Sequence, residues 1–221
     1  MDKILPMLKI EKMMVNPCQE CTHIVWDETG EAVVIDCGVF YPSERRHLLA
    51  LLHQNNLKLV HVLLTHAHHD HLYGNDLLWD NFGLLPELHE ADSRLMKTHV
   101  VQRIKEVYGD KYPYSIPVPD HYLRGGDVIA FGNHQLQVMH TPGHTPGSVV
   151  YYCPEEEVAF TGDTLFAMSV GRTDLEGGNE DELQESLKHL SSILPDDTTI
   201  YPGHGKKSTI GHEKACNPYL L

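Results

Sequence analysis

Residues 57–71, LKLVHVLLTHAHHDH, join an apolar run directly to a cluster of histidines. The apolar part, Leu57 to Thr65, predicts a buried strand. Four histidines and one aspartate follow within residues 66–71. Because burying so many polar groups costs free energy unless they find partners, and because imidazole is the commonest nitrogen ligand of metals, this segment predicts a layered fold that binds metal at the end of a strand.

The composition limits the partners of such a fold. The 221 residues include 17 histidines and have a formal net charge of −14 at pH 7, which opposes a nucleic-acid partner. No apolar run reaches the roughly 18 residues of a membrane span, and the first residues lack the pattern of a signal peptide. The five cysteines are scattered and odd in number, which favours ordinary thiols in a reducing cytoplasm. We therefore expect a cytoplasmic protein with a small-molecule substrate and no membrane contact; the sequence gives no indication of the oligomeric state.

The first half of the chain alternates predicted strands and helices. Residues 21–27 and 31–36 predict a hairpin, and a helix with Ser43 as its N-cap follows to about residue 56. After the strand at 57–65, residues 90–108 predict a helix, and a proline-spaced coil runs to about residue 119. The stretch from about 90 to 120 is expected to form a lid or a pocket wall.

The second half repeats this order with more strands. A helix is predicted at 180–194, with Asn179 as its cap and leucines at helical spacing. The predicted strands are 127–131, 134–140, 147–153, 157–162 and 198–201. Two mixed sheets, each covered by helices on one face, would stack as an αββα sandwich of the α/β class. At this length we expect a single domain, residues 1–221.

Four polar clusters lie just after predicted strands, where ligands sit in layered α/β folds. The first follows the pattern H-x-H-x-D-H, and each of the others presents one side chain beside a glycine. The candidate ligands are His66, His68, Asp70 and His71 in THAHHDH, His144 in TPGHTPG, Asp163 in TGDT, and His204 in YPGHG. Each later cluster is a weak signal by itself, but together they form a complete ligand set.

The ligands divide between two divalent ions. His66, His68 and His144 are assigned to one ion, Asp70, His71 and His204 to the other, and Asp163 bridges them. Three protein ligands and a shared carboxylate leave each ion open, as catalytic sites require. Two ions about 3.5–4 Å apart would hold a bridging hydroxide, with Asp70 and Asp163 as the catalytic carboxylates. The ligand types favour Zn²⁺, and Fe or Mn would also fit.

The ordered motifs THAHHDH, TPGHTPGS, TGDTLF and YPGHG resemble the metallo-β-lactamase superfamily from about Cys21 to the end of the chain. SVGRTDLEGG and the ending GHGKKSTIGHEKACNPYL resemble its short glyoxalase II-like branch, which is similar to hydroxyacylglutathione hydrolases. The resemblance implies the metallo-β-lactamase fold and a role for Asp36 in supporting the metal loop. It disfavours the β-lactam-cleaving members, which lack the bridging aspartate that Asp163 would supply. Only 17 residues follow His204, too few for the glutathione-binding domain of glyoxalase II, so weak selectivity for the thiol half of a substrate is expected.

The motifs contain no clear general acid, which favours a substrate whose leaving group departs without protonation. A thiolate does so because thiols ionise near pH 8.5, whereas an amide anion is far too basic. The sequence therefore predicts a thioester hydrolase first and a lactonase or esterase second. Two further functions are compatible with the motifs: a persulfide dioxygenase with one iron ion, from the same superfamily, and a metal-binding module without catalytic activity.

Overall fold

The first sheet is built from the amino-terminal part of the chain. In this computed structural model, which describes residues 7–109 and 115–220, its order is β1 (Lys9–Val15), β2 (Glu20–Trp26), β3 (Glu31–Ile35) and β4 (Lys58–Leu63). The hairpin and the buried strand that precedes the histidines are thus confirmed, with ends shifted by one or two residues. β3 and β4 are parallel and the other pairs are antiparallel, so the sheet is mixed.

The second sheet has six strands and is also mixed. Its order is β14 (Ser208–Thr209), β13 (Thr199–Pro202), β10 (Val158–Gly162), β9 (Val149–Cys153), β8 (His134–His140) and β7 (Val128–Phe131). Only β10 and β13 pair in parallel within this sheet. Two short pairs lie outside the main sheets: β5 (Leu88–His89) with β6 (Tyr122–Leu123), and β11 (Leu165–Phe166) with β12 (Ser169–Val170).

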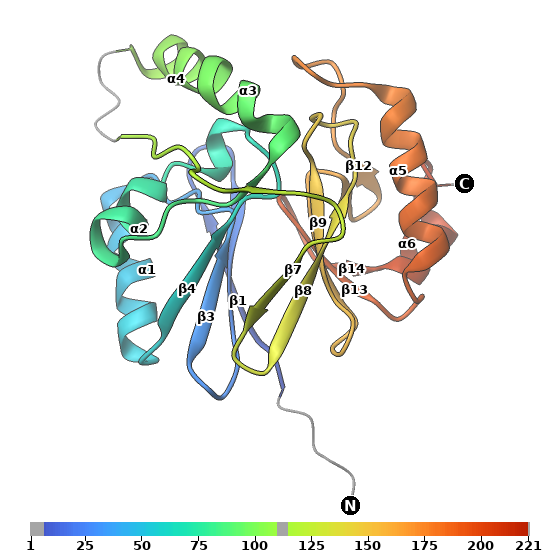
Figure 1. Cartoon of the computed structure of the whole chain (residues 1–221). Helices are drawn as coiled ribbons and strands as arrows, with labels where there is room; N and C mark the ends of the chain where they lie inside the picture. Colours follow the sequence, from blue (N-terminus) through green and yellow to red (C-terminus); the bar gives the residue numbers. More distant parts are fainter. Residues whose placement is uncertain (1–6, 110–114, 221) are drawn as a thin grey trace, which may run out of the picture.

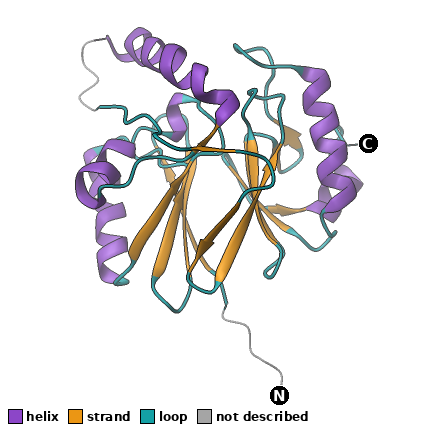
Figure 2. Cartoon of the chain, in the orientation of Figure 1, coloured by secondary structure: helices purple, strands orange, loops and turns teal. Residues whose placement is uncertain are grey.

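The sheets pack face to face, and helices cover their outer faces (Figure 1, Figure 2). Between the sheets lies an apolar core that includes Ile35, Leu63, Tyr151 and Phe160. On the first sheet, α1 (Pro42–Gln54) and α2 (Asn75–Phe82) bury leucines against strand residues such as Val34. On the second, α5 (Glu180–Ile193) packs Leu183, Leu187 and Leu190 inward, and α6 (Ile210–Cys216) lies beside it. This arrangement is the predicted αββα sandwich. In the described part of the chain, no helix is long and apolar enough to cross a membrane.

Two local predictions need correction. The helix expected at 90–108 is broken into η2 (Glu90–Asp92), α3 (Ser93–Leu95), a π-helical turn at Met96–Val100, and α4 (Val101–Tyr108). The N-cap of α1 is Tyr41 rather than Ser43, because Pro42 already begins the helix and the Glu44 carboxylate accepts the backbone N–H of Tyr41 at 3.0 Å. By contrast, Asn179 caps α5 as predicted: its side chain accepts the backbone N–H groups of Asp181 and Glu182.

Candidate metal centre

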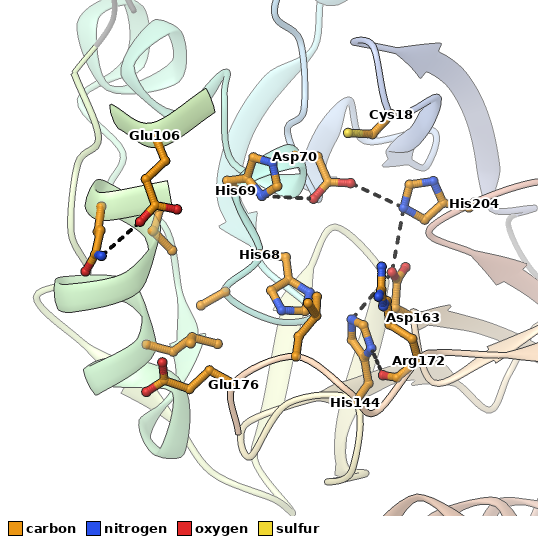
Figure 3. A pocket seen from close by; sticks show the side chains of 15 residues that line it. Cys18, His68, His69, Asp70, Glu106, His144, Asp163, Arg172, Glu176 and His204 are labelled. Atoms are coloured by element: carbon orange, nitrogen blue, oxygen red, sulfur yellow. Dashed lines mark hydrogen bonds and ion pairs between the residues drawn. The ribbon is translucent and has the colours of Figure 1, made fainter. Parts of the chain in front are cut away.

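The seven predicted ligands gather at one end of the sandwich, where four strands of the two sheets end. Figure 3 labels those that line the cavity: His68, Asp70, His144, Asp163 and His204. His66 and His68 follow β4, and the short helix η1 (His69–His71) comes next. The other three come from separate loops: His144 between β8 and β9, Asp163 after β10, and His204 after β13. The core between the sheets therefore fixes the position of each ligand loop.

The first group consists of His66, His68 and His144, whose ligand atoms lie within 4.8 Å of one another. The His66 Nε2 and His68 Nδ1 atoms are 3.1 Å apart. Burial, together with the neighbouring imidazoles, lowers the pKa of His66 and His68 well below 6.5. The rings are therefore neutral at pH 7, which is the protonation state that binds a metal.

The second group consists of Asp70, His71 and His204, again with ligand atoms within 4.8 Å of one another. Asp70 Oδ2 is 3.4 Å from His204 Nε2 and 3.8 Å from His71 Nε2. Burial by itself would lower the pKa of His71, but the surrounding carboxylates, Asp163 first among them, raise it to about 10. This group thus differs from the first in combining imidazoles with a carboxylate.

The carboxylate of Asp163 lies between the two groups. Its Oδ1 is 3.5 Å from His71 Nε2, and its Oδ2 is 3.5 Å from His144 Nε2 and 3.6 Å from His204 Nε2. One side chain therefore reaches imidazoles of both groups, as the sequence assignment of a bridging residue requires.

The donor atoms fit a site built for cations. His71 Nε2, His144 Nε2 and Asp163 Oδ1 are buried and have no hydrogen-bond partner among the described residues. Buried polar atoms without partners are rare in native proteins and call for an explanation. His71 Nε2 lies 3.5 Å from Asp163 Oδ1, and His144 Nε2 lies 3.5 Å from Asp163 Oδ2. These separations are close to the roughly 3.3 Å between two ligands that each bind one ion at about 2.0 Å in tetrahedral geometry. Because these atoms face one another across such gaps, the residues fit bound divalent metal.

Asp36 supports the centre from behind. Its carboxylate accepts the Thr65 backbone N–H and hydroxyl, both at 2.7 Å, and its Oδ2 is 3.0 Å from His71 Nδ1. Asp36, His66 and His71 also have ligand atoms within 4.8 Å of one another. We nevertheless assign Asp36 to orienting the His71 ring, since its two oxygens already hold Thr65 and the His71 Nε2 atom faces Asp163. This placement agrees with the supporting role that the resemblance implied.

A backbone carbonyl, which the sequence does not reveal, orients His144. The His144 Nδ1–H donates to the carbonyl oxygen of Arg172 at 2.7 Å, so Nε2 is left to face the cavity. Gly171 makes this approach possible, because a Cβ there would lie 1.8 Å from the Asp163 carbonyl oxygen. The Arg172 guanidinium pairs with Asp174 through two bonds of 2.6 Å, so this side chain bonds within its own loop.

A cavity of about 580 Å³ opens onto the ligands (Figure 3). Five of the seven ligands line it, whereas His66 and His71 lie behind them. Apolar wall comes from Leu95 and Val100 of the helical segment and from Leu175. The helical part of the stretch predicted to form a lid or pocket wall therefore lines the site, whereas residues 110–114 of the predicted coil lie outside the described residues.

Two further residues of the cavity wall were not recognised from the sequence. His69 is half-buried in the wall, with its Nδ1 3.7 Å from Asp70 Oδ1. Cys18 lines the cavity close to Asp70 and His204 (Figure 3). It follows β1, an element that the sequence pattern did not predict, and the C-x-x-C that it forms with Cys21 did not indicate its position. All five cysteines are unpaired.

Comparison with known proteins places this geometry in a family. A sequence model described as the metallo-beta-lactamase superfamily matches residues 15–204, a span that contains all seven ligands. The chain belongs to the metallo-β-lactamase superfamily. The resemblance seen in the motifs is thus confirmed.

Similar superfamily members have different names. The hydroxyacylglutathione hydrolase GloC of Haemophilus influenzae is 33% identical over 96% of this chain and 98% of its own length. Among solved structures, TTHA1623 in a di-iron-bound form is 37% identical, with a TM-score of 0.81 over 95% of this chain and all of that chain. BLEG-1, called a B3 metallo-beta-lactamase, is 33% identical, with a TM-score of 0.86 over 96% of this chain and all of that chain. The family therefore supports a metal-binding hydrolase but leaves several substrates open.

Proposed function

We propose that this protein is a two-metal hydrolase that cleaves thioesters. The observation that carries the proposal is the Asp163 carboxylate, whose two oxygens reach imidazoles of both ligand groups at 3.5–3.6 Å. In this proposal one divalent ion is held by His66, His68 and His144, and the other by Asp70, His71 and His204. Zn²⁺ is the favoured metal, and the di-iron-bound TTHA1623 makes iron its main competitor.

The chain's own residues divide the chemical work by position. When bound, a pair of divalent ions lowers the pKa of water to about 7 and polarises a substrate carbonyl. Asp70 and Asp163 line the cavity, so their negative carboxylates would lie between the ions and the space for the substrate. His66 and His71 lie behind them, with His71 backed by Asp36. Leu95, Val100 and Leu175 give part of the cavity wall an apolar surface.

The bond to be cleaved follows from the leaving group. A thiolate departs without a proton because its conjugate thiol has a pKa near 8.5, so a thioester needs no general acid in the site. The name of the GloC relative, hydroxyacylglutathione hydrolase, supports a thioester of this type. The name of BLEG-1 favours a β-lactam as the competing substrate, despite the sequence argument against it.

Parallel assays of purified protein test the proposal. S-lactoylglutathione, a lactone, a β-lactam and glutathione persulfide would each be supplied, with thiol release and oxygen consumption recorded together. We expect thiol release from the thioester without oxygen uptake, and much slower cleavage of the lactone and the β-lactam. Oxygen uptake with the persulfide and no thioester cleavage would instead identify a dioxygenase, and preferred cleavage of the β-lactam would identify a lactamase.

A further inference from the structure

Asp92 is a buried carboxylate outside the seven ligands. It has no solvent exposure and ends η2, the turn that begins the helical wall of the cavity. Its two oxygens accept hydrogen bonds from two loops that are far apart along the chain, one containing Ala67 and the other Gly147. Both of these loops carry ligands of the first group.

The contacts of Asp92 are short and lie directly beside the ligands. Its Oδ2 accepts the Ala67 backbone N–H at 2.9 Å, and Ala67 stands between His66 and His68. The same oxygen accepts the Thr145 hydroxyl at 2.8 Å, one residue after His144. Its Oδ1 accepts the Gly147 backbone N–H at 2.6 Å. One carboxylate therefore joins the two segments that supply all three imidazoles of the first group.

The side chains and loops around the Asp92 carboxylate are closely packed. The Thr145 hydroxyl and Ser148 Oγ are 2.8 Å apart, and because Thr145 donates its proton to Asp92, Ser148 must be the donor in this pair. Ser148 Oγ in turn accepts the Thr145 backbone N–H at 3.1 Å. A Cβ on Gly147 would lie 2.6–2.7 Å from Asp92 atoms, so the loop approaches as closely as glycine allows. Without the carboxylate, buried donors of both loops would lose their partner, and buried donors left unpaired are costly.

We propose that Asp92 is a positioning residue for the first ion: it holds the His66–His68 loop and the His144 loop at the spacing at which their imidazoles meet. This inference rests on the proposed metal centre. Asp36 has different contacts: it lies 3.0 Å from His71 of the second group, and it also holds Thr65 at the start of the first ligand loop. The hydrogen bonds of Asp92 go only to loops of the first group, so losing this carboxylate should affect one ion more than the other.

The Asp92→Asn variant tests this division with little change of shape, because it replaces an accepting oxygen by an NH₂ group that faces buried donors. Metal-free protein would be titrated with Zn²⁺, and with Co²⁺ to follow the ligand-field bands of each site. We expect the affinity for one of the two ions to fall about 10–100-fold, the usual effect of losing a group that supports metal ligands. The affinity for the other ion should change by much less, and His144→Ala should weaken the same ion.

Asp27→Asn is the matched control. Asp27 is also a buried aspartate that accepts backbone N–H groups, from Thr29 and Asn133, but it lies at the opposite end of the sandwich. This variant should lower the melting temperature while both ions bind as in the wild type. Asp92→Asn binding both ions normally, or both variants weakening both ions alike, would overturn the proposal.

Thr145→Val keeps the test decisive if Asp92→Asn does not fold. It removes one of the three hydrogen bonds to Asp92 with almost no change of volume, and it should weaken the same ion by a smaller factor. Unchanged affinity in a folded Thr145→Val protein would then reject the role of Asp92. Metal affinity is measured without substrate. A lack of thioesterase activity would therefore reject the proposed reaction without affecting the conclusion about Asp92.

Discussion

Both ends of the sandwich contain buried histidines and aspartates, but the two ends differ in whether these side chains find hydrogen-bond partners. At the end away from the ligands, where the β2–β3 and β7–β8 hairpins turn (Figure 1), the Asp27 carboxylate accepts the backbone N–H of Asn133 at 2.6 Å and contacts His134 at 3.1 Å. His134 also contacts Glu156 at 3.2 Å. At the ligand end, His71 Nε2, His144 Nε2 and Asp163 Oδ1 are equally buried and have no hydrogen-bond partner among the described residues.

This difference separates structural polar groups from functional ones. In the cluster of Asp27, His134 and Glu156 at the hairpin end, each side chain has a partner among its neighbours, so folding alone explains this cluster. At the ligand end, the atoms point at one another across gaps that are too long for good hydrogen bonds and that suit a shared cation. Histidine content does not distinguish the two ends; the state of the donor atoms does.

Replacing the bridging carboxylate should give the largest effect. We expect Asp163→Ala to lower kcat/KM for the thioester by more than about 100-fold, since groups that only support metal ligands already cost 10–100-fold. Asp27→Asn, at the hairpin end, should leave kcat/KM within about twofold of the wild type at a temperature where both proteins are folded. Steady-state kinetics of the two variants would check this, and a similar loss in both would remove the distinction between the ends.

Metal removal should destabilise the protein through the ligand end. An ion present at about 1,000 times its dissociation constant contributes roughly 4 kcal/mol to stability, which for a chain of this size corresponds to about 8–16 °C in melting temperature. Calorimetry with and without a chelator should show such a decrease in the wild type and in Asp27→Asn. A smaller decrease is expected in Asp163→Ala, and an unchanged wild-type melting temperature would argue against tightly held metal.

The smallest expected effect concerns pH at the hairpin end. Burial acts to lower the pKa of His134, but its hydrogen bonds to Asp27 and Glu156 outweigh burial and raise the pKa above 6.5. A raised folded-state pKa stabilises the protein fully below pH 6.5, and this stabilisation is lost as the pH rises through the folded-state value. His134→Gln should therefore show a shallower fall in melting temperature above pH 6.5 than the wild type. Identical slopes would contradict this assignment.

The sequence predicted the elements whose pattern is set by burial on one or both faces. β4 and β10 are apolar runs, and α5 shows leucines at helical spacing, so each was recognised within one or two residues. β1 was missed because it is an edge strand with four of its seven residues exposed, and its apolar residues, Ile10 and the run 13–15, do not alternate with polar ones. α2, β14 and α6 were not predicted either, and the last two are short and depend on contacts with β13.

The candidate ligands could be selected from the sequence because each stands in a short motif after a strand, and the structure brings all seven side chains together. Their supports were not, apart from Asp36. Asp92 acts across loops far apart in the sequence, and Arg172 contributes a backbone carbonyl that any residue type would provide. Only the folded geometry shows that these two groups hold the imidazoles in place.

Crystallographic anomalous scattering at the absorption edge of the bound metal would test the two-ion centre most directly. The account predicts two peaks about 3.5–4 Å apart, one beside His66, His68 and His144 and the other beside Asp70, His71 and His204, with the Asp163 carboxylate between them. A single peak, in crystals of protein purified with metal in excess, would contradict the bridging role of Asp163 and favour a one-metal enzyme.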